Sequence, residues 1–240
     1  MEHKLYSLIS KDISDIARLA LHNKDGGKTM VSSKQYFVVE IMYPIFEILS
    51  KLEDLNCSLY FIKHYPINKT LRRDITREKY IIYHLEHYFI SQISLFDRLL
   101  HFCNMIYEIG LDDRHVTYDI IKNNSKVGND YKITLKKLYN NLEKSEVRIL
   151  QNKIKHKEKL RDKEMEEASF FEMASIAAGS NKNEEDEELL QKATSRAYKR
   201  YLIMKNEKMI EEMKALEGFV MDLFDVAYPI IEGKYKKYKD

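Results

Sequence analysis

The feature that most constrains this chain is its shortage of residues that break helices. Its 240 residues include only 7 Gly and 3 Pro. Two long runs, residues 73–109 and 134–178, contain neither residue. Strand-rich folds need many tight turns, and Gly and Pro dominate those turns. The sequence therefore predicts an all-α fold with long helices and few connections.

Apolar residues recur at helical spacing along most of the chain, which indicates where these helices lie. The expected helices are residues 2–22, 33–56, 73–109, 112–123, 134–178 and 187–217. Gly110 is expected to stop the third helix, and Gly218 to interrupt the chain after the last. The segment GSNKNEEDEE, residues 179–188, is expected to be an acidic loop. We therefore expect an up-and-down bundle of about five to seven helices.

Charge and cysteine content set further limits. The chain carries 40 basic and 38 acidic residues, for a net charge of +2, so only local clusters can indicate a partner. Cys57 and Cys103 are too few for a disulfide framework and are expected to be reduced thiols. The N-terminus lacks the apolar core of a signal peptide, and no window approaches the ~18 apolar residues of a membrane span. We therefore expect a cytoplasmic protein with no membrane partner.

The most unusual local cluster is QNKIKHKEKLRDK, residues 151–163. Asn152 and His156 lie four residues apart, and Arg148 lies four residues before Asn152, so on a helix all three form one stripe. Six Lys or Arg against two acids give residues 153–163 a local net charge of +4 in a nearly neutral chain. The lysines expected to contact a nucleic-acid backbone are Lys153, Lys155, Lys157 and Lys159.

These side chains suit chemistry on a phosphodiester. A neutral histidine such as His156 accepts a proton from a ribose 2′-OH near neutral pH, and an amide such as Asn152 orients the imidazole or the sugar. A guanidinium such as Arg148 binds the charge that develops on the phosphate. No metal or cofactor is required for this route. A solvated basic helix with one surface histidine explains the same residues and stays open as an alternative.

The same stretch resembles a known family. QNKIKH is similar to the RNxxxH signature of the HEPN superfamily, the higher-eukaryote and prokaryote nucleotide-binding helical domains. Upstream, SLFDRLLHFCNMIYEIGL (residues 94–111) looks like part of the helix pair of one prokaryotic HEPN group. The resemblance covers roughly residues 80–165. It implies one all-helical domain over residues 1–240, with a HEPN-like core at about 73–178 and the acidic loop and C-terminal helices over 179–240.

The resemblance also implies a function, because many members of the superfamily share one activity. They are metal-independent ribonucleases of antiviral defence or toxin–antitoxin systems, and they form homodimers in which two motif helices face each other. RNA or nucleotide would be the ligand, and an antitoxin or regulatory protein a further partner. His156 and Asn152 occupy the His and Asn positions of the motif, whereas Gln151 stands at the position of its arginine. Glutamine brings no charge to the phosphate, and Arg148 is the candidate replacement.

Three functions therefore stay open from the sequence. The first is a ribonuclease with His156 as general acid or base. The second is an inactive HEPN protein that binds nucleotide, RNA or a protein partner, with Gln151 as the mark of lost chemistry. The third is a helical interaction protein without affinity for RNA. The sequence has no Walker loop, GxGxxG, HExxH or paired CxxC, which disfavours the classes that depend on them.

Other candidate groups lie on the predicted helix 73–109. The pairs His84 with His87 and Asp97 with His101 have spacings that suit metal ligands, but no complete ligand set accompanies them, so packed or surface side chains are favoured. The polar residues that could face the motif, or simply solvent, are Glu86, Gln92 and Asp97. The aromatic residues expected in the core, with base stacking as the alternative, are Tyr80, Tyr83, Tyr88 and Phe89.

Overall fold

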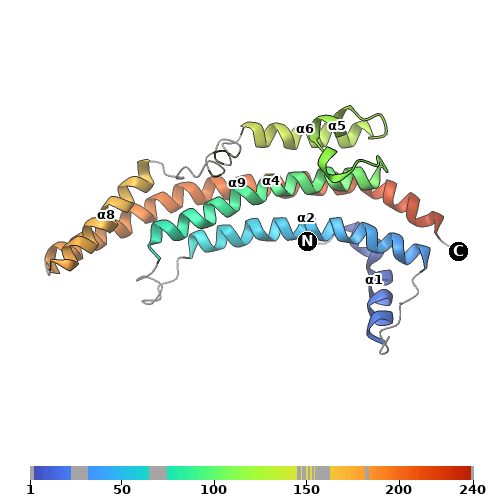
Figure 1. The fold of residues 1–240 in the computed structure, drawn as a ribbon. Helices are drawn as coiled ribbons and strands as arrows, with labels where there is room; N and C mark the ends of the chain where they lie inside the picture. Colours follow the sequence, from blue (N-terminus) through green and yellow to red (C-terminus); the bar gives the residue numbers. More distant parts are fainter. Residues whose placement is uncertain are drawn as a thin grey trace. The chain divides into compact units, whose positions relative to one another are not determined.

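The regular secondary structure in the described part of the chain is entirely helical, as a computed structural model shows (Figure 1). The structure describes residues 3–22, 32–64, 75–144, 163–181 and 184–238, together with Val147, Leu150, Asn152 and Ile154. The helices are α1 (Lys4–His22), α2 (Ser33–Lys63), α4 (Arg77–Ile106), α5 (Tyr118–Asn123), α6 (Asn129–Lys144), α8 (Lys163–Ser180) and α9 (Glu184–Lys237), with the 3-10 turn η1 (Asp113–His115). The predicted all-α class is confirmed.

Contacts divide the chain into two compact units, and each unit is assembled from separate stretches of sequence. Unit 1 comprises Met1–Leu52, Ile93–Lys144 and Leu216–Asp240, and unit 2 comprises Glu53–Gln92 and Ser145–Ala215. The helices α2, α4 and α9 each contribute residues to both units. The expectation of one domain over residues 1–240 with a core at about 73–178 stays a prediction.

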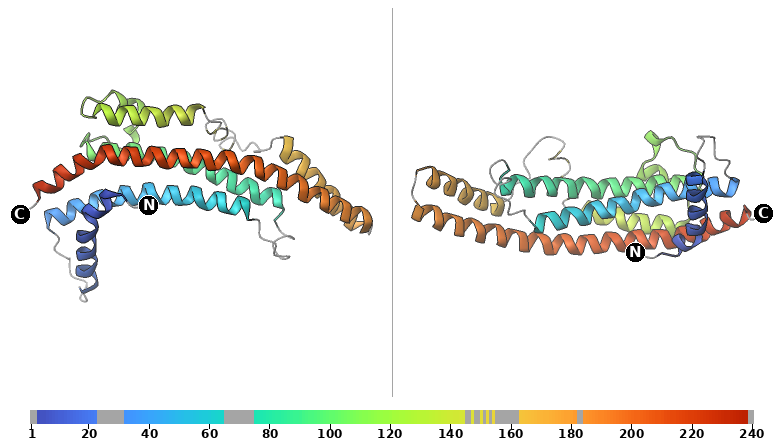
Figure 2. Two further views of the ribbon diagram at one scale, coloured as in Figure 1. Left: turned by 180° about the vertical axis from the view of Figure 1, so that it is seen from behind. Right: turned by 90° about the horizontal axis from the view of Figure 1, so that it is seen from below.

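Unit 1 is built around segments of three long helices, α2, α4 and α9, which lie side by side (Figure 2). Their apolar residues recur at helical spacing and are buried, and the rings of Phe102 and Phe224 meet edge to face at 5.7 Å. Asp12 of α1 accepts a hydrogen bond from the Tyr235 hydroxyl and pairs with Lys34 at 3.1 Å. These polar contacts attach α1 to α2 and α9.

The short helices α5 and α6 pack on α4 within unit 1. Tyr131 of α6 is fully buried, and its hydroxyl donates to the backbone carbonyl of Leu99 at 3.1 Å. The rings of Tyr118 and Tyr139 stack at 3.9 Å. The Thr117 side chain accepts a hydrogen bond from the Ile120 N–H and so caps the start of α5.

The end of α4 differs from the expectation that Gly110 stops the helix. The Ile109 N–H bonds to the carbonyl of Asn104, and the Glu108 N–H bonds to that of Met105. These two bonds form a Schellman motif, in which the residue in the left-handed region is Glu108, at φ +49°. Gly110, at φ +83°, lies two residues further on, so it shapes the loop rather than the helix end.

The predicted acidic loop between the last helices is wrong for most of its length. α8 continues to Ser180, and α9 begins at Glu184, so the acidic residues Glu184–Glu187 form the first turn of α9. Carboxylates at a helix N-terminus are stabilised by the unsatisfied N–H groups and the helix dipole, which explains why these acids form helix. The predicted interruption at Gly218 is also wrong, since α9 continues through Gly218 and Pro229.

Candidate functional site

Of the predicted site residues in the motif segment, Asn152 is the one that the structure describes. Asn152 is helical and exposed. Val147 is buried, and Leu150 and Ile154 are half-buried, so the apolar positions with i, i+3, i+7 spacing turn inward while Asn152 turns outward. The predicted site residues that lie outside the described residues are Arg148, Gln151, Lys153, Lys155, His156, Lys157 and Lys159. Asn152 has the exposure that contact with a ligand requires.

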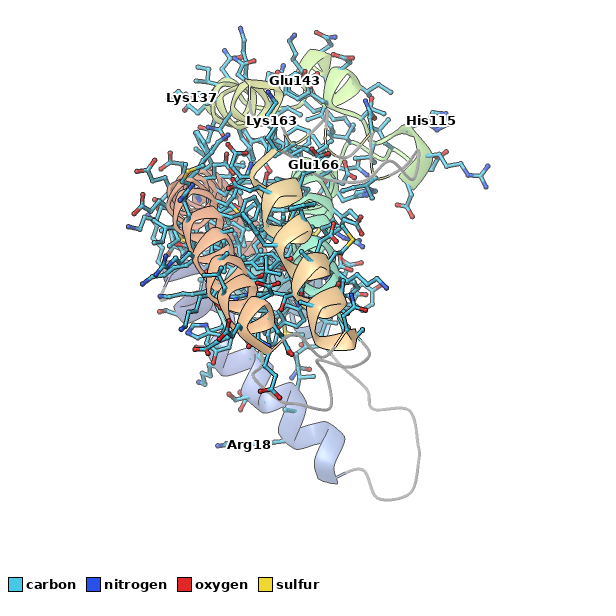
Figure 3. The ribbon with its side chains drawn as sticks, turned by 90° about the vertical axis from the view of Figure 1, so that its left-hand side faces the viewer. Arg18, His115, Lys137, Glu143, Lys163 and Glu166 are labelled. Carbon is cyan, nitrogen blue, oxygen red and sulfur yellow. The ribbon has the colours of Figure 1, made fainter. Side chains whose placement is uncertain are left out.

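The basic stretch ends where α8 begins. Lys163 is the first residue of α8, and both Lys163 and Glu166 on its first turn are exposed (Figure 3). The buried residues Met165, Ala168 and Ser169 lie on the other side of the same turns. The Lys163 ammonium is therefore in contact with solvent, as a cation that attracts phosphate must be.

A polar network in unit 2 ties the start of α4 to α8 and α9. The Glu172 carboxylate accepts a hydrogen bond from the backbone N–H of Arg77 at 3.2 Å and one from the Tyr198 hydroxyl at 2.7 Å. The Arg77 guanidinium lies 5.0 Å from the centre of the Tyr198 ring. Burial, and then the neighbouring Glu172, raise the pKa of Tyr198 well above its ordinary value, so the phenol remains a proton donor to the carboxylate.

This network was not foreseen from the sequence. Arg77 and Glu172 are 95 positions apart, and no local pattern links residues at that separation. The carboxylate oxygens of Glu172 are both engaged by donors of other helices. Its role is therefore to hold three helices of unit 2 together rather than to carry chemistry.

A second group in unit 2 surrounds the imidazole of His84. Burial, and then the neighbouring His87, lower the pKa of His84, so this imidazole is neutral at pH 7. His87 Nδ1 lies 2.9 Å from the hydroxyl of Ser58 on α2. The rings around His84, with centroids 4.5, 5.0 and 5.2 Å away, are those of Tyr80, Phe61 and Tyr83.

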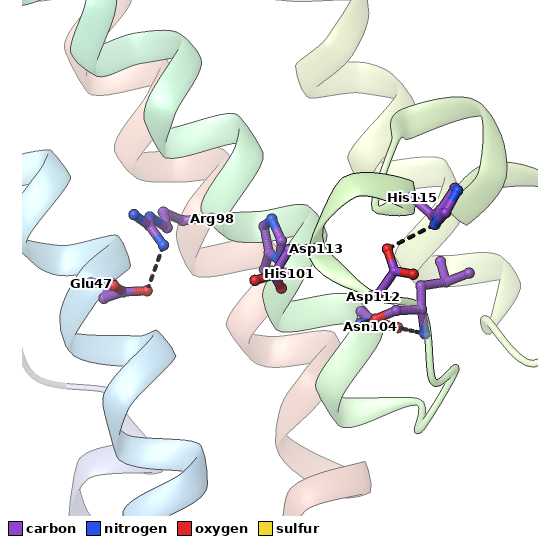
Figure 4. Close-up of polar contacts among 8 residues, drawn as sticks. Glu47, Arg98, His101, Asn104, Asp112, Asp113 and His115 are labelled. Atoms are coloured by element: carbon purple, nitrogen blue, oxygen red, sulfur yellow. Dashed lines mark hydrogen bonds and ion pairs between the residues drawn. The ribbon is translucent and has the colours of Figure 1, made fainter.

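The histidines near the end of α4 have carboxylate partners in unit 1 (Figure 4). His101 Nδ1 lies 3.6 Å from a carboxylate oxygen of Asp113, and His115 Nδ1 lies 2.7 Å from one of Asp112. On the adjoining face of α4, Arg98 binds Glu47 of α2 at 3.0 Å. The His101 pair joins α4 to η1 and the Arg98 pair joins α4 to α2, whereas the His115 pair is local to η1.

The polar residues suggested as companions of the motif differ in burial. Gln92 is 2% exposed, Glu86 is half-buried, and Asp97 is exposed. Burial raises the pKa of Glu86. Within the described ranges, no group of three or more His, Cys, Asp or Glu residues is arranged to hold a metal ion. None of the described helices is long and apolar enough to cross a membrane.

Comparison with known proteins identifies the class of this helical chain. It is a HEPN protein, because a HEPN family model matches residues 45–231, most of the chain. The family is the Cthe2314-like HEPN family, and the chain belongs to it. The match begins in α2 and ends in α9, beyond the region in which the sequence resemblance was recognised. No curated protein and no solved structure matches the chain.

Proposed function

We propose that this chain is a HEPN-type endoribonuclease that cleaves RNA without a metal ion. The observation that carries the proposal is the coincidence of family and motif: QNKIKH lies inside the matched range 45–231. The exposed, helical Asn152 supports a motif that faces its ligand. A component of antiviral defence or of a toxin–antitoxin pair, regulated by an antitoxin, is the setting that such an activity suits.

The proposed reaction is an internal transesterification. His156 accepts the proton of a ribose 2′-OH, and the freed oxygen attacks the adjacent phosphorus. The bond from phosphorus to the 5′-oxygen breaks, and that oxygen takes a proton from a second acid, for which His156 of the partner subunit is suited in a dimer. The products are a 2′,3′-cyclic phosphate and a 5′-hydroxyl. Asn152 orients the reacting groups.

The charge on the phosphate is the step that this sequence alters. Gln151 donates hydrogen bonds but carries no positive charge. A guanidinium binds phosphate through hydrogen bonds and through its positive charge. Arg148 is four residues before Asn152, one helical turn away, and takes this role in the proposal. Lys153, Lys155, Lys157 and Lys159 add sequence-independent attraction to the RNA backbone.

Incubation of a labelled single-stranded RNA with excess EDTA tests the proposal. The wild-type chain is expected to cleave it, and His156→Ala is expected to lower the rate by roughly 100-fold or more, the usual contribution of a general acid or base. The matched control is His115→Ala, which removes an exposed histidine of unit 1 and is expected to cleave normally. Full cleavage by His156→Ala would rule the mechanism out.

Arg148 is tested in the same assay. Arg148→Ala is expected to lose most of the cleavage, and Arg148→Lys to recover only part of it, since an ammonium does not form the bidentate contact. Unchanged cleavage by Arg148→Ala would assign the phosphate contact elsewhere.

A non-catalytic HEPN protein is the second candidate, and Gln151 is the observation that favours it. In that case the chain binds RNA, its affinity falls as salt rises, and no cleavage accompanies binding. Gln151→Arg would then restore the family's motif, and cleavage gained by that variant would identify the lost group.

A further inference from the structure

A cluster of aromatic rings joins α2 and α4 within unit 2, and we call it the aromatic platform. Its members are Tyr60 and Phe61 of α2, His64 directly after α2, and Tyr80, Tyr83 and His84 of α4. Phe61 and His84 stack across the two helices, with centroids 5.0 Å apart and planes 23° from parallel. Tyr60 and His64 stack at 4.3 Å and 27°. The rings therefore form a connected surface rather than isolated side chains.

The platform is open to solvent. Tyr83 is 64% exposed, Tyr60 59% and Phe61 41%. Burying a large aromatic side chain stabilises a protein, so three adjacent rings left in water call for an explanation. The platform is not a part of the core that happens to reach the surface, since the core of this region is made by residues such as Ile62, Ile81 and Leu85.

The composition of the platform distinguishes it from another exposed apolar surface of unit 2. That surface is the face of α8 formed by Phe170, Met173 and Ile176, which is mostly aliphatic or flexible. Every member of the platform is instead an aromatic ring, and most carry a polar edge, either a hydroxyl or an imidazole nitrogen. Flat rings with hydrogen-bonding edges match nucleobases, which stack through their faces and bond through their edges.

Charge favours the same ligand. Lys63 follows Tyr60 by three residues and Lys79 precedes Tyr83 by four, so each lies on the same helix face as a platform tyrosine, and both are exposed. The acid at comparable spacing on α4 is Glu86, which is half-buried and whose pKa burial raises. Two lysines beside exposed rings give the pairing of cations and stacking surfaces that single-stranded nucleic acids bind.

We infer that the aromatic platform of unit 2 binds unpaired bases of single-stranded RNA, with Tyr83 and Tyr60 as the stacking residues. The inference rests on the proposed function in one respect, since RNA is the ligand of both. It adds a binding surface outside the QNKIKH motif and predicts a preference for unpaired RNA over duplex. Stacking uses the faces of the bases, so the platform tolerates any sequence.

The absence of Trp from the chain makes a direct test available. Tyr83→Trp keeps a stacking ring and adds a single indole, whose fluorescence is quenched when a base stacks on it. The probe is a 12-nucleotide oligo(A) RNA, and all chains in the binding assays carry His156→Ala so that the proposed chemistry does not consume it. The matched control is Tyr43→Trp, at a tyrosine that is 65% exposed on α2 in unit 1. Quenching is expected at position 83 and not at position 43. Binding of the RNA without quenching at position 83 would overturn the inference.

Affinity supplies the second measurement. Because stacking on one aromatic ring is worth about 1–3 kcal/mol per base, Tyr83→Ala is expected to weaken binding of the same RNA about 5- to 150-fold. Tyr43→Ala is expected to leave binding unchanged. Equal affinities with Tyr83 and with Tyr83→Ala, or equal losses in both variants, would refute the platform.

The two proposals fail in different ways. Tyr83→Ala loses stacking but keeps the cleavage chemistry, so it is expected to cleave RNA at saturating concentration with a raised KM. His156→Ala is expected to bind RNA without cleaving it. RNA binding by the wild type that is independent of Tyr83 refutes the platform alone. A wild-type chain that binds no RNA refutes both proposals.

Discussion

Among the described residues, Glu108 is the non-glycine residue with a positive φ, at +49°. It occupies the left-handed region that ends α4, where a residue with a Cβ costs about 1–2 kcal/mol more than glycine. Two lysines engage it: the Lys234 ammonium bonds to its carboxylate, and the Lys126 ammonium donates to its backbone carbonyl at 2.7 Å. The bond from Lys234 lowers the pKa of Glu108, so this carboxylate is ionised at neutral pH.

Substitution of Glu108 by Gly and by Ala isolates the backbone contribution, because both variants lose the carboxylate. We expect Glu108→Gly to be more stable than Glu108→Ala by about 1 kcal/mol, measured by urea unfolding. The control is the exposed Glu40 inside α2, where the order reverses and Ala is more stable than Gly by about 1 kcal/mol. Equal stabilities of the two Glu108 variants would show that the surrounding contacts remove the strain.

At the scale of elements, α9 continues for 54 residues although it contains Gly218, Gly233 and Pro229. A Cβ placed on Gly218 would meet nothing within 4 Å, and the residue is exposed. Glycine inside a helix is unfavourable because the unfolded chain gains conformational entropy from it. The helix at Gly218 is therefore stabilised by the packing of neighbouring residues and not by Gly218 itself.

Gly218→Ala is expected to stabilise the chain by roughly 0.5–1 kcal/mol, read as a higher urea midpoint with an unchanged slope. Gly110 provides the contrast. A Cβ at Gly110 also has open space, but its φ of +83° is unfavourable for alanine. Gly110→Ala is therefore expected to destabilise the chain by about 1 kcal/mol or more. Stabilisation by both substitutions would contradict this account.

At the scale of the whole molecule, HEPN membership makes a homodimer the natural arrangement for the proposed reaction, since it supplies a second histidine. We expect light scattering after size exclusion to give a particle of twice the chain mass of 28.6 kDa. The control is the same measurement on His156→Ala, which alters the chemistry and is expected to leave the mass unchanged. A monomer at the concentrations that support cleavage would exclude a shared site.

Much of the fold followed from the sequence, because helical spacing and the lack of Gly and Pro are local signals. The errors arose where electrostatics or hydrogen bonding override composition: Glu184–Glu187 form helix because of the helix dipole, and Glu108 rather than Gly110 closes α4. The family was recognisable from QNKIKH. For Tyr83 the sequence favoured the core and left base stacking as the alternative, because helical spacing does not reveal how far a ring is exposed. Tyr88 on the same helix is fully buried, as expected.

The interrupted sequence of the two units has a consequence for how the protein is made. Unit 2 needs residues up to Ala215, and unit 1 needs Leu216–Asp240 in addition to stretches synthesised much earlier. A nascent chain therefore holds most of its helices before either unit has all of its parts. Neither unit can therefore complete its packing before residue 215 has been translated, so both units fold late in synthesis.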